Sequence, residues 1–335
     1  MYVEYFGLKE EPFNLAPDPK FFYLAEGHKE ALARLQFAMD MRKGLVVLTG
    51  EVGSGKSTII KSFMGNLKHD QNVALIVNPR IIGSKLIQNV CREFGIELDF
   101  NQMSKSDILN LLYEFILKKT FYRQNFSVII DDAHELTPEQ LDEILLFTKI
   151  ETNTQQLRQV FLVGLPELME KLKAPQFLPI FQRIQIQYFL KPFSYSDTQN
   201  YIYYRLSKAG LSQSDLFKAD AVQRIYQLSG GFPRTITIIA SNALLYGYLN
   251  GLKKIDYHAI NLATDETLQK ISNNKPAAES MQLGEKFPPQ FSEVPPVYRP
   301  KRKWLKWTFI GIGLIVSLLL VNIIAQYLIN YFDLF

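Results

Sequence analysis

The stretch Gly50-Glu51-Val52-Gly53-Ser54-Gly55-Lys56-Ser57 fits the spacing G-x-x-x-x-G-K-[ST] at every fixed position. The apolar run 45–49 precedes it, and a helical pattern over 58–67 follows. Strand, glycine-rich loop and helix are the context in which this spacing binds phosphate. The alternative is a glycine-rich turn that binds nothing, and the agreement of so many fixed positions argues against it.

The residue types of this loop suit a nucleoside triphosphate such as ATP. Glycines let backbone N–H groups approach the phosphates, and the positive end of the following helix faces the same charge. We expect Lys56 to reach the β- and γ-phosphates and the Ser57 hydroxyl to hold Mg²⁺. The nucleotide-binding residues predicted in this way are Gly50, Glu51, Val52, Gly53, Ser54, Gly55, Lys56, Ser57 and Thr58.

A second nucleotide signature follows the apolar run 126–130, which ends in the acids Asp131 and Asp132. We expect Asp131 to orient Mg²⁺ through its waters and Asp132 to polarise the attacking water. A strand that merely ends in a turn-favouring acidic pair is the alternative. The position of this strand, after a phosphate loop in the same domain, favours the nucleotide role.

Strands and helices alternate through the first part of the chain, which predicts an α/β fold with a parallel sheet covered on both faces. Ligand then binds at the carboxyl ends of the strands. Beyond Pro192 the pattern is purely helical, which predicts a small helical lid. The remaining strands are expected at 73–77, 159–164 and 184–190. Helices are expected at 27–41, 84–94, 106–120, 138–147, 195–209, 219–228, 233–249 and 256–270.

The length of 335 residues suggests about two domains. Before the loop, Phe13, Phe21 and Phe22 either line an adenine pocket or pack against the core, and the sequence leaves both open. The predicted division is an amino-terminal segment (1–43), a P-loop ATPase core (44–191), a helical lid (192–270), a proline-rich linker (271–303) and a membrane anchor (304–332).

The anchor is predicted because no charged residue occurs from Trp307 to Phe332, and about 20 apolar residues span a bilayer. The basic cluster 301–306 marks the cytoplasmic side, and residues 1–5 do not begin a signal peptide. We therefore expect a single-pass protein of a bacterial inner membrane, with its bulk in the cytoplasm and a short carboxyl-terminal tail outside.

Composition excludes several other classes of site. The formal net charge of +4 is mild, so no specific nucleic-acid partner is expected. Cys91 is the only cysteine, which excludes an internal disulfide and a cysteine-rich zinc site. The four histidines have no metal-ligand spacing.

Several short motifs occur in a fixed order over roughly residues 1–270. They are Tyr5-Phe6-Gly7-Leu8, Pro12-Phe13, Asp18-Pro19, Glu26-Gly27-His28-Lys29-Glu30-Ala31-Leu32, Leu48 to Thr58, Asp131-Asp132-Ala133-His134, Leu162-Val163-Gly164, Pro166-Glu167-Leu168, Gln182-Arg183-Ile184 and Gly230-Gly231-Phe232-Pro233-Arg234. Together they resemble the ATPases of the general secretion pathway protein A (ExeA-like) family. The resemblance implies an AAA+ ATPase of the inner membrane, linked to type II secretion and to related pilus and polysaccharide-export systems.

The resemblance assigns roles to two arginines. Arg183 looks like an arginine finger that reaches the γ-phosphate of a neighbouring subunit, which implies a homo-oligomeric ring or dimer. Arg234 looks like the lid arginine that senses the γ-phosphate in cis. A planar guanidinium suits both roles, although a surface arginine and a first-turn arginine remain the structural alternatives.

This sequence departs from the family pattern at three points. Asp132 stands where the family usually has a glutamate, and Glu135 is a less favoured candidate for that glutamate's role. Leu165 stands where a polar residue usually helps to place the attacking water. Both departures predict slow hydrolysis. The chain ends soon after the predicted span, where relatives often carry a peptidoglycan-binding domain. We therefore expect a partner protein, such as a secretion or pilus assembly protein, to transmit any effect across the membrane.

Three functions follow from these features. The first is a membrane-anchored AAA+ ATPase that couples ATP hydrolysis to assembly of a secretion, pilus or polysaccharide-export machine. The second is a nucleotide-gated binding module with little turnover. The third, an ATPase of DNA transposition or replication, is disfavoured by the mild charge and by the anchor, and lipid headgroups explain the basic cluster better.

Overall fold

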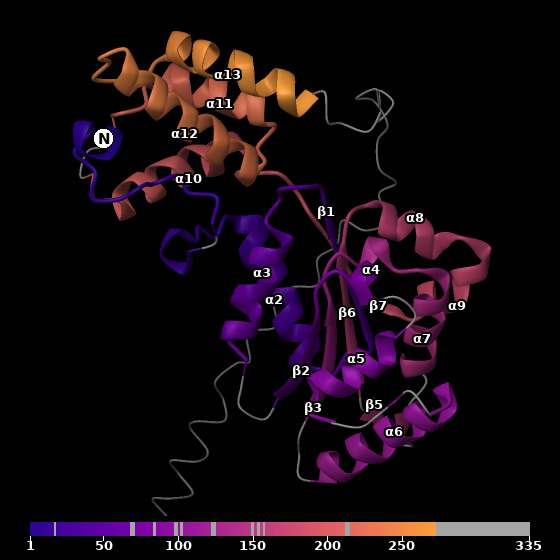
Figure 1. Cartoon of the computed structure of the whole chain (residues 1–335). Helices are drawn as coiled ribbons and strands as arrows, with labels where there is room; N and C mark the ends of the chain where they lie inside the picture. The colour runs from indigo at the N-terminus through magenta and orange to yellow at the C-terminus, as the bar shows by residue number, and fades with distance from the viewer. Residues whose placement is uncertain are drawn as a thin grey trace, which may run out of the picture. The chain divides into compact units, whose positions relative to one another are not determined.

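A parallel five-stranded sheet organises the described residues of the computed structural model (Figure 1). The structure describes residues 1–272 apart from 17, 68–70, 83–84, 97–99, 101–102, 122–124, 149–150, 153–154, 157 and 212–214. In spatial order the strands are β2 (Gln71–Ile76), β3 (Asn125–Ile130), β6 (Arg158–Gly164), β1 (Leu45–Gly50) and β7 (Ile184–Leu190). Every neighbouring pair is parallel, so the predicted α/β class and parallel sheet are confirmed.

The central strands β3, β6 and β1 are mostly buried apolar runs because the sheet is covered on both faces, whereas the edge strand β7 alternates half-buried and exposed residues. Successive side chains of β1 point to opposite faces: Leu45 and Val47 enter one apolar cluster, while Val46 and Leu48 enter another. Figure 1 shows α2 and α3 on one side of the sheet and α5 and α7 on the other. The bounds of the covering helices are α2 (Glu26–Asp40), α3 (Lys56–Gly65), α5 (Leu86–Glu93), α6 (Lys105–Phe121) and α7 (Pro138–Thr148).

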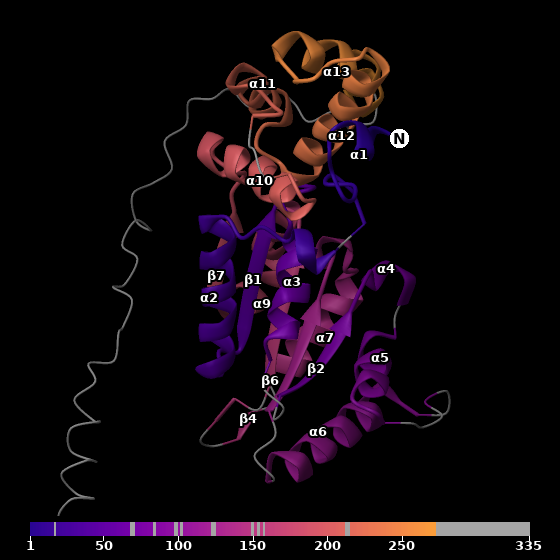
Figure 2. The same cartoon turned by 90° about the vertical axis from the view of Figure 1, so that its left-hand side faces the viewer.

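Helices α10 to α13 follow the last strand, and we call them the lid. They are α10 (Tyr195–Lys208), α11 (Ala219–Ser229), α12 (Pro233–Leu249) and α13 (Tyr257–Ser272). The amino-terminal segment packs on the lid: Phe13 and Phe21 belong to its apolar cluster, and helix α1 (Tyr2–Tyr5) lies beside α12 (Figure 2). Phe13 and Phe21 therefore pack in a core, which was one of the two alternatives for them. That core belongs to the lid and not to the sheet.

A buried arginine ties the amino-terminal segment to the lid. Arg205 of α10 donates hydrogen bonds to the Asn14 carbonyl, the Tyr201 hydroxyl and the Thr237 hydroxyl, at 3.0, 2.6 and 3.1 Å. Its guanidinium also lies over the rings of Phe13, Phe21 and Tyr201. The attraction of these rings for a cation compensates part of the cost of burying the charge.

Several short elements have no counterpart among the elements predicted from the sequence. They are too short for a periodic pattern to indicate them. These are α1, α4 (Pro79–Ile82), α8 (Glu167–Lys173), α9 (Leu178–Phe181), the hairpin strands β4 (Glu151–Thr152) and β5 (Gln155–Gln156), and the 3-10 turns η1 (Pro19–Phe21), η3 (Ala133–Glu135) and η4 (Pro175–Phe177).

The predicted linker from residue 273 onward and the predicted anchor at 304–332 lie outside the described residues. Within the described part of the chain, no helix is both long enough and apolar enough to cross a bilayer. The membrane span therefore stays a prediction from the sequence.

Candidate nucleotide-binding site

The loop between β1 and α3 has the backbone shape that its glycines predict. Gly53 and Gly55 have φ angles of 77° and 100°, in the left-handed region that favours glycine. A Cβ on Gly55 would lie 2.7 Å from Nε2 of His28, so no larger residue fits without displacing that ring. Gly55 also immediately precedes α3, so the first free N–H groups of the helix open toward the loop.

Lys56 lies inside this loop and is only 7% exposed. Its ammonium donates hydrogen bonds to the carbonyl oxygens of Gly50 at 2.7 Å and of Glu51 at 2.9 Å. Burial lowers the pKa of Lys56, and the charges of Asp131 and Asp132 oppose this shift. The lysine predicted to meet the β- and γ-phosphates is therefore held at the loop and in the electrostatic range of both predicted acids.

The two acids follow directly on β3. Asp131 is 6% exposed, and its backbone N–H donates to the Ile76 carbonyl at 2.9 Å, continuing the ladder between β2 and β3. Its carboxylate accepts the Asp132 N–H at 3.0 Å, and Asp132 adopts a left-handed conformation with φ 52°. That conformation is strained for a non-glycine residue, a feature that clusters at functional sites.

Oxygen donors at this site fit a magnesium ion. Ser57 is exposed in the first turn of α3, and the Asp131 carboxylate stands at the carboxyl end of β3. The buried Ser54 hydroxyl has no hydrogen-bond partner among the described residues. A loop with an unsatisfied hydroxyl at the start of a helix suits a phosphate ligand. Ser57 and Asp131 would hold the ion, which neutralises charge on phosphoryl oxygens when bound.

Arg234 reaches the phosphate loop from the lid. Its backbone N–H donates to the Gly53 carbonyl at 3.3 Å, and a Cβ on Gly53 would lie 3.0 Å from the Arg234 Cβ. The preceding turn is equally tight, because a Cβ on Gly231 would lie 2.2 Å from the Phe193 carbonyl oxygen. The structure thus places Arg234 against the loop, while its action on the γ-phosphate stays a prediction.

Arg183 does not join this site within one chain. It precedes β7, whose first residue Ile184 pairs with Leu45, whereas the phosphate loop begins beyond Gly50 at the other end of β1. At about 3.3 Å per residue, the length of β1 separates these two ends by roughly 17 Å. One guanidinium nitrogen of Arg183 donates to the Thr148 carbonyl at 3.2 Å. This position rules out a role in cis and is compatible with the predicted role in trans.

Two polar residues at the site are not among the site residues predicted from the sequence. His28 of α2 is 3% exposed, and its Nε2 donates to the Ser54 carbonyl at 3.1 Å, because a carbonyl can only accept. Burial lowers the pKa of His28. Asn78 follows β2 beside the end of β3, with φ 55° and a buried side-chain oxygen that has no partner among the described residues. No periodicity marks either residue, because both depend on long-range packing.

Leu165 lies directly after β6, as predicted, and brings no hydrogen-bonding side chain to the strand ends. Asn78 lies near these ends, and its side-chain oxygen, like the Ser54 hydroxyl and Nδ1 of His134, has no hydrogen-bond partner among the described residues.

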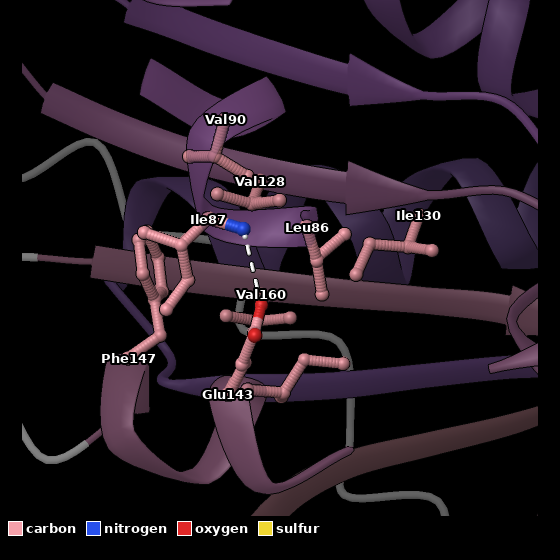
Figure 3. A pocket seen from close by; sticks show the side chains of 9 residues that line it. Leu86, Ile87, Val90, Val128, Ile130, Glu143, Phe147 and Val160 are labelled. Carbon is pink, nitrogen blue, oxygen red and sulfur yellow. Dashed lines mark hydrogen bonds between the residues drawn. The ribbon is translucent and has the colours of Figure 1, made fainter. Parts of the chain in front are cut away.

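The cavity in Figure 3 is a separate feature of the core. Its one charged residue, Glu143, accepts the Ile87 N–H at 3.1 Å and pairs with Lys105 at 2.9 Å. The carboxylate is therefore satisfied, and the cavity holds no part of the predicted nucleotide site. Its lining residues are Leu86, Ile87, Val90, Val128, Ile130, Glu143, Ile144, Phe147 and Val160.

Comparison with known structures supports the fold. The structure of Cdc6p from Pyrobaculum aerophilum matches with a TM-score of 0.60 and 17% identity, covering 79% of this chain and 74% of that chain. Drosophila ORC bound to DNA matches with a TM-score of 0.58 and 16% identity, covering 80% of this chain and 68% of that chain. At such low identity these likenesses establish the fold alone.

Sequence comparison gives a nearer relative. Residues 39–172 match the AAA domain family. General secretion pathway protein A of Aeromonas hydrophila is 36% identical over 266 residues, which cover 79% of this chain and 48% of the relative. The chain thus spans about half the length of the curated relative that it matches. The resemblance inferred from the motifs is confirmed: this chain is a relative of general secretion pathway protein A and carries an AAA domain of the P-loop NTPase fold.

Proposed function

We propose that this protein is an AAA+ ATPase that binds ATP with Mg²⁺ and hydrolyses it. The observation that carries the proposal is the meeting of Lys56, the Asp131–Asp132 pair and the lid residue Arg234 around one glycine-rich loop. These elements supply a cation for the phosphates, oxygens for the metal and a carboxylate for the water.

Each side chain has a distinct role in this proposal. The Lys56 ammonium leaves the carbonyls of Gly50 and Glu51 and donates to phosphate oxygens, which carry more charge. The Asp132 carboxylate polarises the attacking water. Arg234 stabilises the charge that develops on the transferred phosphoryl group.

The active form is a homo-oligomer, a ring or a dimer, in which Arg183 completes the site of the neighbouring chain. Arg183 precedes β7 at the end of the sheet away from the phosphate loop of its own chain, and this position supports the arrangement. The test mixes two inactive variants, Lys56→Ala and Arg183→Ala, and measures ATP hydrolysis. Mixed oligomers contain some sites with an intact loop and an intact arginine, so partial recovery is expected. A mixture as inactive as its components would contradict a shared site.

We further propose that the protein is held in the inner membrane by residues 304–332 and assists assembly of a secretion, pilus or polysaccharide-export machine. The relation to general secretion pathway protein A supports this role. The test is a crosslinked pull-down from membranes, with Lys56→Ala as the matched variant. Recovery of an assembly protein by the unchanged chain, and its loss with Lys56→Ala, is expected. Equal recovery by both chains would contradict a nucleotide-dependent role.

A nucleotide-gated module with little turnover is the second candidate. The observation that favours it is Leu165, which offers no hydrogen bond to water at the strand end, together with the short Asp132 side chain. Single-turnover and steady-state hydrolysis in the presence of lipid separate the two candidates. A bound ATP that persists through many minutes of incubation would favour the switch, and repeated turnover would favour the ATPase.

A further inference from the structure

Lys171 of helix α8 binds the backbone directly after the two acids. Its ammonium donates to the His134 carbonyl at 2.5 Å and to the Leu136 carbonyl at 3.0 Å. These acceptors lie 37 and 35 residues earlier in the chain, so the contact joins two separate connections of the sheet. The nucleotide site described above makes no use of Lys171.

The backbone that Lys171 binds belongs to the short 3-10 turn η3 (Ala133–Glu135) and its C-cap Leu136, and Asp132 immediately precedes this turn. Asp132 is its N-cap in the left-handed conformation, with no side-chain capping bond. Inside the turn, the Glu135 N–H donates to the Asp132 carbonyl at 2.9 Å and the Leu136 N–H to the Ala133 carbonyl at 3.2 Å. Carbonyls at the end of so short a turn lack internal partners, and a cation satisfies them well.

The carboxyl end of β6 packs closely against the turn η3. A Cβ on Gly164, the last residue of β6, would lie 3.0 Å from the His134 backbone nitrogen. Helix α8 starts three residues later, at Glu167, and the Leu168 N–H donates to the Leu165 carbonyl at 3.0 Å. The end of β6, the start of α8 and the Lys171 ammonium therefore surround the turn on which Asp132 is mounted.

We propose that Lys171 is a positioning residue for Asp132. By bridging two carbonyls of the turn, Lys171 keeps Asp132 in a backbone conformation that a non-glycine residue leaves readily. The Asp132 carboxylate then keeps one direction relative to the phosphate loop. This inference rests on the proposed ATPase function, because it assigns Lys171 a task in the same reaction.

The test compares three variants of the full chain. Lys171→Met removes the ammonium and keeps a long side chain, Lys171→Arg keeps a donor, and Lys173→Met changes an exposed lysine of the same helix. We expect Lys171→Met to lower kcat on the order of tenfold, because misplaced catalytic groups lose rate steeply. Its Kd for ATP should stay within about twofold of the unchanged protein. Lys171→Arg should recover most of the lost rate, and Lys173→Met should behave as the unchanged protein.

Two readouts distinguish positioning from a general structural role. In the Asp132→Asn background, Lys171→Met should cause no further loss of kcat, because its effect passes through Asp132. Hydrogen exchange of the peptide 131–137 should be faster in Lys171→Met than in Lys173→Met. The proposal is overturned if Lys171→Met lowers ATP affinity and melting temperature together with kcat. It is also overturned if Lys171→Met lowers kcat further in the Asp132→Asn background.

Hydrogen exchange also keeps this inference separate from the proposed function. If the unchanged protein hydrolyses no ATP, the proposed reaction fails. Hydrogen exchange of residues 131–137 then still tests whether Lys171 holds the turn. Equal exchange rates in Lys171→Met and Lys173→Met would overturn the positioning role. If the unchanged protein hydrolyses ATP and Lys171→Met is equally fast, the inference fails while the proposed function stands.

Discussion

Replacing Gly231 by alanine is expected to loosen the lid at the point where it meets the phosphate loop. A Cβ on Gly231 would lie 2.2 Å from the Phe193 carbonyl oxygen, so the backbone must move. The Phe193 N–H donates to the Gly231 carbonyl at 2.9 Å, and this bond is weakened by the same movement. The neighbouring Gly230 is a matched control, because it also has a positive φ but meets only the Phe232 ring, at 3.5 Å.

The expected losses in the free energy of unfolding differ between the two glycines. A left-handed alanine costs about 1–2 kcal/mol at either position. Gly231→Ala adds about 1 kcal/mol for the lost hydrogen bond. The steric displacement adds at least about 1 kcal/mol more. Gly230→Ala should therefore lose about 1–2 kcal/mol, and Gly231→Ala roughly 3 kcal/mol or more.

Urea unfolding of both variants measures this difference, and ATP hydrolysis reports its functional effect. Because α12 begins two residues after Gly231, movement there separates Arg234 from the Gly53 carbonyl. Gly231→Ala should therefore lose turnover more strongly than ATP affinity, while Gly230→Ala keeps both. Equal losses of stability for the two variants would refute the proposed steric contact, and unchanged turnover in Gly231→Ala would refute the coupling of lid and loop.

Three further variants test other contacts. Burial lowers the pKa of His28 in the folded protein, so on acidification the unfolded chain takes up a proton at a higher pH than the folded protein does. The free energy of unfolding should therefore fall as the pH drops below about 6.5. In urea unfolding, His28→Gln should reduce this dependence on pH. Arg205→Ala should lower the free energy of unfolding by roughly 2–4 kcal/mol through lost hydrogen bonds and ring contacts, and a loss no larger than that of exposed Arg80→Ala would contradict this. Asp132→Asn should keep ATP affinity and lose turnover, and normal hydrolysis would exclude Asp132 as the acid that polarises water.

The parts of the fold that the sequence predicts are those that local patterns encode. The central strands are buried apolar runs, β7 alternates apolar and polar residues, and each long helix has an apolar face, so periodicity places these elements within a few residues. The phosphate loop is also local, because eight consecutive residues define it. Arg234 was found through a motif, and the structure places its backbone against Gly53.

The residues that escaped prediction act through contacts between distant segments. His28 meets Ser54 across 26 residues, and Lys171 meets the turn after Asp132 across more than 30. Asn78 lies beside the end of β3 only because β2 pairs with β3. The packing of Phe13 on the lid depends on chain folding over nearly the whole described length. No local spacing encodes such contacts, because the partner is fixed by topology.

Calorimetric titration of ATP into the purified full chain, with and without Mg²⁺, tests the nucleotide site most directly. We expect saturable binding that Mg²⁺ strengthens, that Lys56→Ala abolishes and that Asp132→Asn retains. A chain that shows no magnesium-dependent affinity for ATP, or one that binds equally well without the Lys56 ammonium, would contradict the claim that this loop is a nucleotide site.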